Sequence, residues 1–408
     1  MTNHPANSDQ TSRPAESQAG RLRRATPLEL FADLVFAAAV GQAATRLTEH
    51  PTPTGLRIFA LEFALVWWLW VVQAFAADRV DDDSTAHRLL VMASLLPAAG
   101  VATALARTPG DGDFLFVISY VLARLGPAAL YALAARAEHG HRGAHQTALH
   151  RILWIYTTGT AVAACGWLSG LAFSGATRYS LWAAAFSIEL ALPFLNRSAI
   201  SRAPRSGAHL AERYGLFTLI VLGESIIGPI SQAAHVALSA AAMCALAASL
   251  VLSGCLWWTY YRVEEHPAFG GRFWHLELFS LGHLPLSMAI SAIGSGSALL
   301  IATAARDGAA SLTPIAAACL TGATAVFFAV VAALRLPFTG LRREVSAPLI
   351  AALLLAILTP LSAHVPAVIT VAITSAIAAA SIAFTPPRER AHGTVIQQHQ
   401  PPIESTGS

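Results

Sequence analysis

Apolar stretches about as long as a bilayer is thick follow one another along almost the whole chain. This feature restricts the fold more than any other. A helix needs roughly 20 mostly apolar residues to cross the hydrocarbon core of a membrane. Only 12% of the residues are charged, against about 25% in an average soluble protein. The sequence therefore predicts an all-α, polytopic helical membrane protein.

The apolar pattern predicts twelve spans, which a linker-like stretch divides into two groups of six. The predicted spans are residues 28–48, 56–77, 87–106, 114–136, 151–173, 179–195, 209–231, 236–261, 275–304, 312–335, 346–362 and 365–384. The predicted organisation is a disordered cytoplasmic tail (1–24), a first six-helix half (25–196), a cytoplasmic linker (197–207), a second six-helix half (208–385) and a second disordered cytoplasmic tail (386–408).

The arginines test this count, because cytoplasmic loops carry an excess of basic residues. All 26 basic residues are arginine. With the N-terminus in the cytoplasm, 20 of them fall on the cytoplasmic side and five on the opposite side, while Arg124 lies inside the fourth span. This bias supports both the span count and a topology with both termini in the cytoplasm.

The two groups of spans resemble each other. Glu29-x-Phe31 at the start of the first span matches Glu212-x-Tyr214 at the start of the seventh. Gly41-Gln42 matches Gly223-Glu224 at nearly the same offset. Six spans per half give both halves the same orientation, so the pattern indicates a parallel repeat, an arrangement known from transporters.

Charged residues inside the spans are candidates for function, because a charge at the bilayer centre costs roughly 2.5–3.5 kcal/mol on insertion scales. Glu29 and Asp33 are four residues apart and share one face of the first helix. They could share a proton and form part of an ion or substrate site. Alternatively, Glu29 lies at the cytoplasmic interface beside Arg24.

The seventh span holds a second set of charges. Glu212 and Arg213 can be placed at the cytoplasmic edge, with Arg213 as a snorkelling anchor. Glu224 follows eleven residues later, about 16 Å deeper in the membrane, and anchoring does not explain it. Glu224 and its neighbour Ser225 are therefore candidate ion or substrate ligands, with a structural hydrogen bond as the alternative role for Glu224. Glu212 is also a candidate ligand.

Four further residues complete the candidate ion or substrate site: Glu62, Arg124, Glu189 and His283. Arg124 is the natural counter-charge for one of the intramembrane acids, but the sequence leaves open which one. His283 lies beside a proline kink, where it either belongs to a polar patch or bonds to a backbone carbonyl.

The segment between the second and third spans is dense in charge. Asp81, Asp82, Asp83, His87 and Arg88 could form a vestibule that attracts cations. The alternative is capping of the third span by Asp83 or Ser84, because such residues are favoured as N-caps and acidic residues are favoured at a helix N-terminus.

Motifs typical of enzymes are missing from the sequence. It contains no Walker loop, no HExxH, no GxSxG and no kinase motif. We expect no enzymatic activity, no cofactor, no metal and no nucleic-acid binding. The expected partners are the lipid bilayer and a small ion or small molecule.

Four motifs carry a resemblance to a known family: Glu29-Leu30-Phe31-Ala32-Asp33-Leu34-Val35-Phe36, Arg79-Val80-Asp81-Asp82-Asp83 with His87-Arg88, Glu212-Arg213-Tyr214-Gly215-Leu216-Phe217 with Leu222-Gly223-Glu224-Ser225, and Gly282-His283-Leu284-Pro285. With them the chain resembles the bacterial low temperature requirement protein A (LtrA) family over most of residues 24–385. Ala32 departs from the aromatic residue that the family more often has. The resemblance implies a protein of the bacterial cell (inner) membrane and no defined activity.

Three functions fit these observations. The first is a proton- or cation-coupled transporter in which Asp33, Glu62, Glu189 and Glu224 bind the ion. The second is a cation channel, since the first helix is also similar to the Phe-Ser-Asp helix of two-repeat potassium channels, with Ala32 in place of the serine. The third is a membrane scaffold or sensor linked to growth in the cold.

Overall fold

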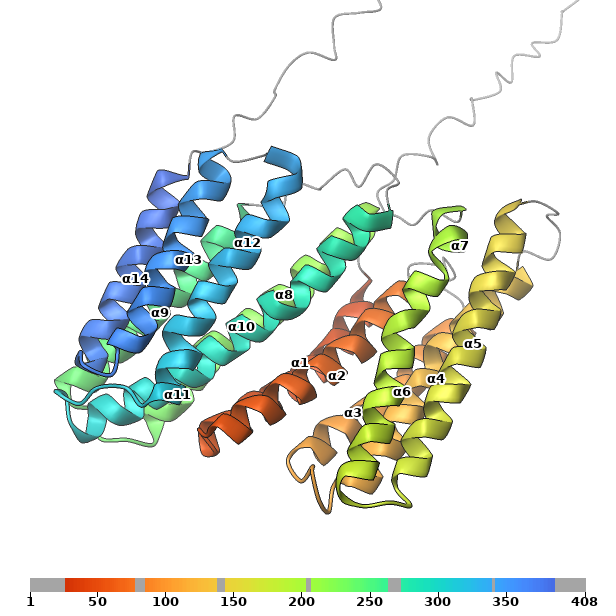
Figure 1. The fold of residues 1–408 in the computed structure, drawn as a ribbon, viewed down its shortest axis with the longest axis horizontal. Helices are drawn as coiled ribbons and strands as arrows, with labels where there is room; N and C mark the ends of the chain where they lie inside the picture. The colour runs from red at the N-terminus through yellow and green to blue at the C-terminus, as the bar shows by residue number, and fades with distance from the viewer. Residues whose placement is uncertain are drawn as a thin grey trace, which may run out of the picture.

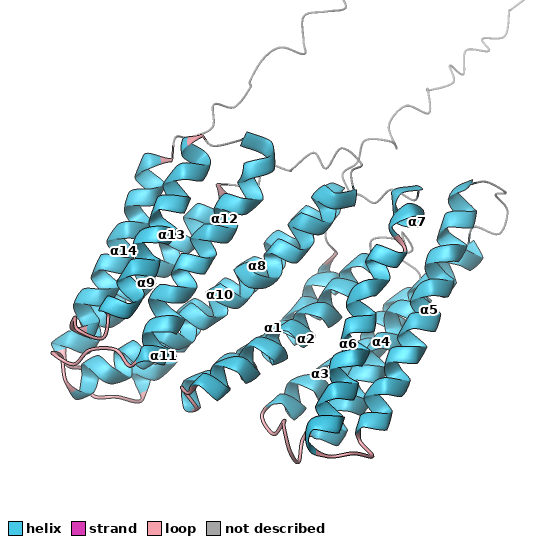
Figure 2. Cartoon of the chain, viewed as in Figure 1, coloured by secondary structure: helices cyan, strands magenta, loops and turns pink. Residues whose placement is uncertain are grey.

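The computed structural model describes residues 26–77, 85–137, 144–202, 207–262, 273–339 and 342–385. Within these ranges the chain is mostly helical and forms no β-strand (Figure 2). The helices are α1 (Pro27–Glu49), α2 (Pro53–Ala77), α3 (Thr85–Leu105), α4 (Asp113–Ala137), α5 (Ala144–Gly170), α6 (Gly175–Leu195), α7 (Arg197–Arg202), α8 (Gly207–Ala234), α9 (Ala240–Tyr261), α10 (Phe273–Arg306), α11 (Pro314–Ala317), the π-helical η1 (Ala318–Gly322), α12 (Ala323–Thr339), α13 (Arg343–Leu361) and α14 (Ala367–Phe384).

The predicted class of an all-α, multi-pass membrane protein is confirmed. Each predicted span falls on a helix, and α11, η1 and α12 together form the predicted tenth span. Within the described ranges, ten helical spans are long and apolar enough to cross a membrane. The two predicted spans outside this set are α4, with 25 residues, and α6, with 21. The count of twelve crossings stays a prediction.

The predicted linker and tails lie largely outside the described residues. The short helix α7 occupies the first part of the linker, and residues 203–206 are not described. The segments 1–25 and 386–408 are not described either. The division into two halves therefore stays a prediction at its boundaries.

Local sequence signals explain where the first helix begins. Thr26 is the N-cap of α1, and its hydroxyl accepts a hydrogen bond from the Glu29 backbone N–H at 3.2 Å. The Glu29 carboxylate in turn accepts one from the Thr26 backbone N–H at 2.8 Å. Pro27 follows the cap, where its missing N–H costs nothing. This capping box fixes the start of α1 and with it the depth of the acidic residues that follow.

Four helices occupy the middle of the molecule. α1 contacts α2, α3, α8 and α10, while α2 also contacts α8 and α10. In Figure 1, α3 to α6 lie on one side of this group and α9 and α12 to α14 on the other. The helices of the predicted first and second halves therefore meet along α1, α2, α8 and α10.

Helices α1 and α8 run in the same direction. Arg213 of α8 contacts Asp33 near the start of α1, and Glu224, farther along α8, lies against Gly41, farther along α1. Corresponding pairs also pack in both halves: α1 with α3 as α8 with α10, and α5 with α6 as α13 with α14. This is the pattern that a parallel repeat would produce.

Candidate functional site

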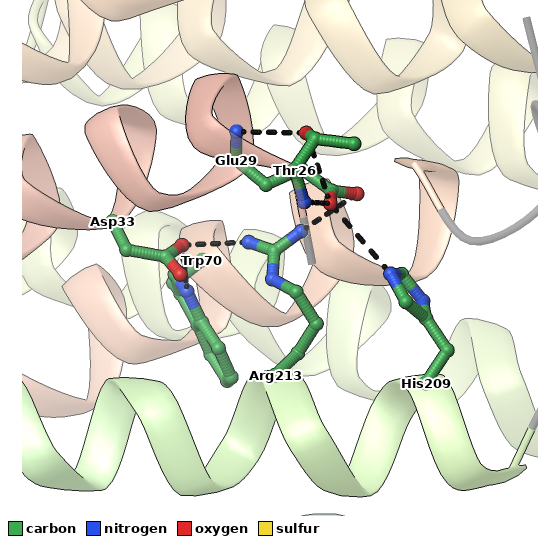
Figure 3. A network of polar contacts seen from close by, with 6 residues as sticks. All are labelled: Thr26, Glu29, Asp33, Trp70, His209 and Arg213. Atoms are coloured by element: carbon green, nitrogen blue, oxygen red, sulfur yellow. Dashed lines mark hydrogen bonds and ion pairs between the residues drawn. The ribbon is translucent and has the colours of Figure 1, made fainter. Parts of the chain in front are cut away.

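An arginine from the second half is held between two acids of the first half. Arg213 Nη2 donates a hydrogen bond to Asp33 Oδ1 at 2.6 Å, and its Nη1 lies 3.4 Å from Glu29 Oε1 (Figure 3). Trp70 Nε1 donates to the same Asp33 oxygen at 2.8 Å. Arg213 is 2% exposed and Asp33 0%. A cluster of charges therefore joins α1, α2 and α8 out of contact with solvent.

The interpretation of Arg213 as a snorkelling anchor is wrong. A snorkelling arginine keeps its guanidinium in water, whereas that of Arg213 is buried between carboxylates. The expected pairing of Glu29 with Arg24 lies outside the described residues. Within them Glu29 contacts Arg213, and His209 Nε2 lies 3.6 Å from Glu29 Oε2. The acids of α1 supply the counter-charge that water would otherwise provide.

Aromatic side chains hold Trp70 in the orientation that Asp33 requires. The Trp70 ring stacks on Phe217 with centroids 4.1 Å apart and meets Tyr214 edge-on at 4.9 Å. Both partners come from α8, which also carries Arg213. Trp70 and Arg213, the two donors to Asp33, are therefore both positioned by the packing of α2 against α8.

Replacement of Trp70 by phenylalanine should cost about 1.5–3 kcal/mol of unfolding free energy, because a buried hydrogen bond to a charged group is lost while the ring stacking remains. The measurement is the unfolding free energy of the detergent-solubilised protein. Trp68→Phe is the matched control. Trp68 is also buried, but its Nε1 has no hydrogen-bond partner among the described residues. Equal losses for both variants would contradict this role of Trp70.

The counter-charge of Arg124 is Glu189. Arg124 Nε lies 3.2 Å from Glu189 Oε2, and both side chains are buried. Tyr120 donates its hydroxyl to Glu189 Oε2 at 2.9 Å, and Trp167 Nε1 donates to Oε1 at 3.2 Å. This ion pair links α4 to α6 inside the first half and answers the question that the sequence left open.

Glu62 also has an arginine partner. Arg46 Nη1 donates to Glu62 Oε1 at 2.7 Å and to the Leu105 carbonyl at 2.8 Å. The contact ties the last turn of α1 to α2 and to the end of α3. The charge of Glu62 is thus balanced by Arg46. This pair lies near one end of the helix bundle, and Arg213 lies near the other end.

Glu224 differs from Asp33, Glu62 and Glu189, which each have an arginine partner. Its side chain is half-buried near the middle of α8, and within the described residues it has neither a hydrogen bond nor an ion pair. It lies against the backbone of α1: a Cβ added to Gly41 would be 3.0 Å from Glu224 Oε1. The Glu224 carboxylate therefore faces the backbone of a glycine, which supplies no counter-charge.

The other predicted site residues do not belong to these charge clusters. Ser225 is buried and donates to the Leu222 carbonyl at 2.7 Å. His283 is buried with Nδ1 2.7 Å from the Phe279 carbonyl and Nε2 3.0 Å from Tyr260 Oη. Glu212 is half-buried in the second turn of α8. Of the predicted vestibule, Asp81, Asp82, Asp83 and the His87 side chain lie outside the described residues, and Arg88 is exposed.

Sequence reasoning missed the neutral donors of these clusters. Trp70 and Trp167 each donate an indole N–H to a buried acid, Tyr120 donates a hydroxyl, and His209 lies beside Glu29. Aromatic residues are common in membrane helices, so none of them stood out. The ionisable residues, which are rare inside spans, gave the signal.

Comparison with known proteins agrees with the fold and the motifs. The family described as "Bacterial low temperature requirement A protein (LtrA)" matches residues 24–383. An uncharacterized protein of Rhizobium meliloti (strain 1021), RA0937, is 26% identical over 277 residues, which is 63% of this chain. The match spans 65% of the length of that curated relative. Since the family match covers nearly the whole helical region, the chain belongs to the bacterial low temperature requirement A family.

Proposed function

We propose that this protein is a proton- or cation-coupled transporter of the bacterial inner membrane and that Glu224 binds the coupling ion. The observation that carries the proposal is the difference among the four acids expected to bind the ion. Asp33, Glu62 and Glu189 each have an arginine partner. Glu224 has none within the described residues. A carboxylate at mid-span needs a proton or a cation to offset its insertion cost.

The place of Glu224 in the fold supports a transport role. It lies where α8 of the predicted second half meets α1 of the first half. In transporters built from repeats, ion and substrate sites lie near the bilayer midplane at the repeat interface. Because Gly41 has no side chain, α1 and α8 do not interlock through side chains at this level. This favours movement of one helix against the other.

Gln42 supports access of water to the same place. Its side chain is exposed one residue after Gly41, near the middle of α1. An amide facing lipid at this depth would leave polar groups without hydrogen bonds, which costs several kcal/mol for each group. A polar path that reaches Gln42 and the half-buried Glu224 accounts for both residues.

The arrangement favours a transporter over a channel formed within one chain. The channel hypothesis requires Phe31 and Asp33 to line one path. Phe31 is 50% exposed on the outer face of α1, whereas Asp33 is buried and bonded to Arg213 and Trp70. The two side chains lie on different faces of the helix.

The test is ion flux into liposomes that contain the purified full-length chain. We expect saturable proton or potassium uptake by the wild type and uptake at the level of protein-free liposomes for Glu224→Gln. Glu49→Gln is the matched control, because Glu49 is an exposed acid at the end of α1. Absence of flux in folded wild-type protein would overturn the proposal in favour of a scaffold or sensor, and linear, unsaturated current would favour a channel.

A further inference from the structure

Helices α8 and α10 present a row of hydroxyl groups to each other. Two contacts fix how the helices are aligned: the hydroxyls of Tyr214 and Ser280 bond to each other, and a Cβ on Gly228 would lie 3.1 Å from the Gly294 carbonyl oxygen. Both pairs are 66 residues apart in sequence, so the helices run parallel and in constant register. Side chains on the facing sides between these contacts must meet.

Three buried hydroxyls without a hydrogen-bond partner in the described ranges lie between the two contacts, beside Ser225, which donates to the Leu222 carbonyl. Helical periodicity places Thr218 on the face of α8 that carries Tyr214 and Gly228, and places Ser287 and Ser291 on the face of α10 that carries Ser280 and Gly294. All three side chains are fully buried. Their oxygens have no hydrogen-bond partner among the described residues.

The lack of a hydrogen-bond partner within the described ranges sets these three hydroxyls apart from most buried hydroxyls of this protein. Several other buried hydroxyls in the described spans donate to the carbonyl four residues earlier, as Ser249, Thr324 and Thr374 do. Besides the three, Thr259 and Ser297 are the buried hydroxyls without a hydrogen-bond partner among the described residues. An unpaired buried hydroxyl costs about 1–3 kcal/mol. Three of them on two facing helices point to a partner that the protein does not itself supply.

The spacing of the row fits water. At 1.5 Å of rise per residue, Ser291 lies about 6 Å beyond Ser287 along α10. Hydroxyl oxygens at such separations are too far apart to bond directly. One water molecule between them would make two hydrogen bonds of about 2.8 Å each.

We propose that Thr218, Ser287 and Ser291 bind a file of ordered water molecules between α8 and α10, and that the file carries protons between the Arg213–Asp33 cluster and Glu224. At one end, Tyr214 packs edge-on against Trp70, which donates to Asp33. At the other end, Ser291 lies opposite Ser225. Gly294, one turn after Ser291, packs against the Glu224 carbonyl. Each oxygen in the file accepts one proton from one neighbour and releases one to the next. The proton-carrying role rests on the proposed function, whereas the binding of water does not.

Hydroxyl-radical footprinting in ¹⁸O-labelled water tests the file directly, because ionising radiation converts bound water into hydroxyl radicals, which oxidise the adjacent side chains. Tyr214 is 1% exposed, and we expect it to be labelled severalfold more than Phe327 and Phe328, which are 0% exposed on α12. Thr218→Val should lower the labelling of Tyr214. Labelling of Tyr214 no higher than that of Phe327 would overturn the proposal.

Thermal unfolding gives an independent readout. If Thr218 and Ser287 bind water, Thr218→Val and Ser287→Ala lower the midpoint of unfolding, because a water molecule loses a partner inside the protein. If the hydroxyls are unpaired, both changes raise the midpoint and the proposal fails. The proposed transport can fail separately: wild-type protein that labels at Tyr214 but carries no protons would keep the water file and overturn the transport function.

Discussion

Replacement of Arg213 by methionine is expected to cost about 3–5 kcal/mol of unfolding free energy, since removal of one partner leaves an uncompensated buried charge. Two carboxylates lose their counter-charge at once: Asp33, which is fully buried, and Glu29, which is 6% exposed. Trp70 and His209 remain beside them, but a neutral donor offsets less charge than a guanidinium does. Methionine keeps much of the packing volume, so the loss reports on charge.

The measurement is the unfolding free energy of the purified protein in detergent. Arg57→Met serves as the control, because Arg57 is exposed and bonds only to Thr54 among the described residues. Adding Glu29→Gln and Asp33→Asn to Arg213→Met should restore much of the stability, because replacing a whole buried ion cluster by neutral groups is often close to neutral. If the triple variant is no more stable than Arg213→Met, unpaired charge is not the cause of the loss.

The helices could be predicted from the sequence because a bilayer restricts what can cross it. Only helices and closed barrels satisfy the backbone in hydrocarbon, so each apolar run had to become a helix of known minimum length. The run 28–48 became α1 at Pro27–Glu49, and 365–384 became α14 at Ala367–Phe384. Small differences at the ends come from capping groups such as Thr26, which hydropathy does not register.

The pairing of charges could not be predicted in the same way. Asp33 and Arg213 are 180 residues apart, and Arg124 and Glu189 lie on helices that are not neighbours in sequence. Hydropathy places each charge at a depth but says nothing about which helices pack together. The depth alone made an anchor the simplest interpretation of Arg213, and only the packing of α8 on α1 shows its partners.

Glu224 is the acid that the sequence marked as hardest to explain, and its role as an ion ligand stays a prediction. It lies too deep for anchoring and about 16 Å from Arg213 along the helix. Asp33, Glu62 and Glu189 are no longer candidates for free carboxylates, because each has an arginine partner. Glu224 remains a candidate ion ligand, because Gly41 of α1, which lies opposite to it, offers no counter-charge.

Replacement of Gly294 by alanine should separate α8 from α10 and cost about 1–3 kcal/mol, as overpacking of a tight core does. The new Cβ would lie 2.6 Å from the Glu224 carbonyl oxygen, 3.0 Å from the Glu224 carbonyl carbon and 3.2 Å from Ser225 Cα. These are backbone atoms within a helix, so a side-chain rotation cannot relieve the contact. The helices themselves must move.

Gly254→Ala is the matched control for this change. Gly254 lies inside α9 and has no atom within 4 Å of an added Cβ, so alanine should stabilise the helix by up to about 1 kcal/mol through its higher helix propensity. Unfolding in detergent measures both variants, and equal effects would show that the contact at Gly294 is not tight. Because the same contact holds Glu224 opposite Gly41 and Ser291 opposite Ser225, ion uptake by Gly294→Ala should fall even at temperatures where the variant remains folded.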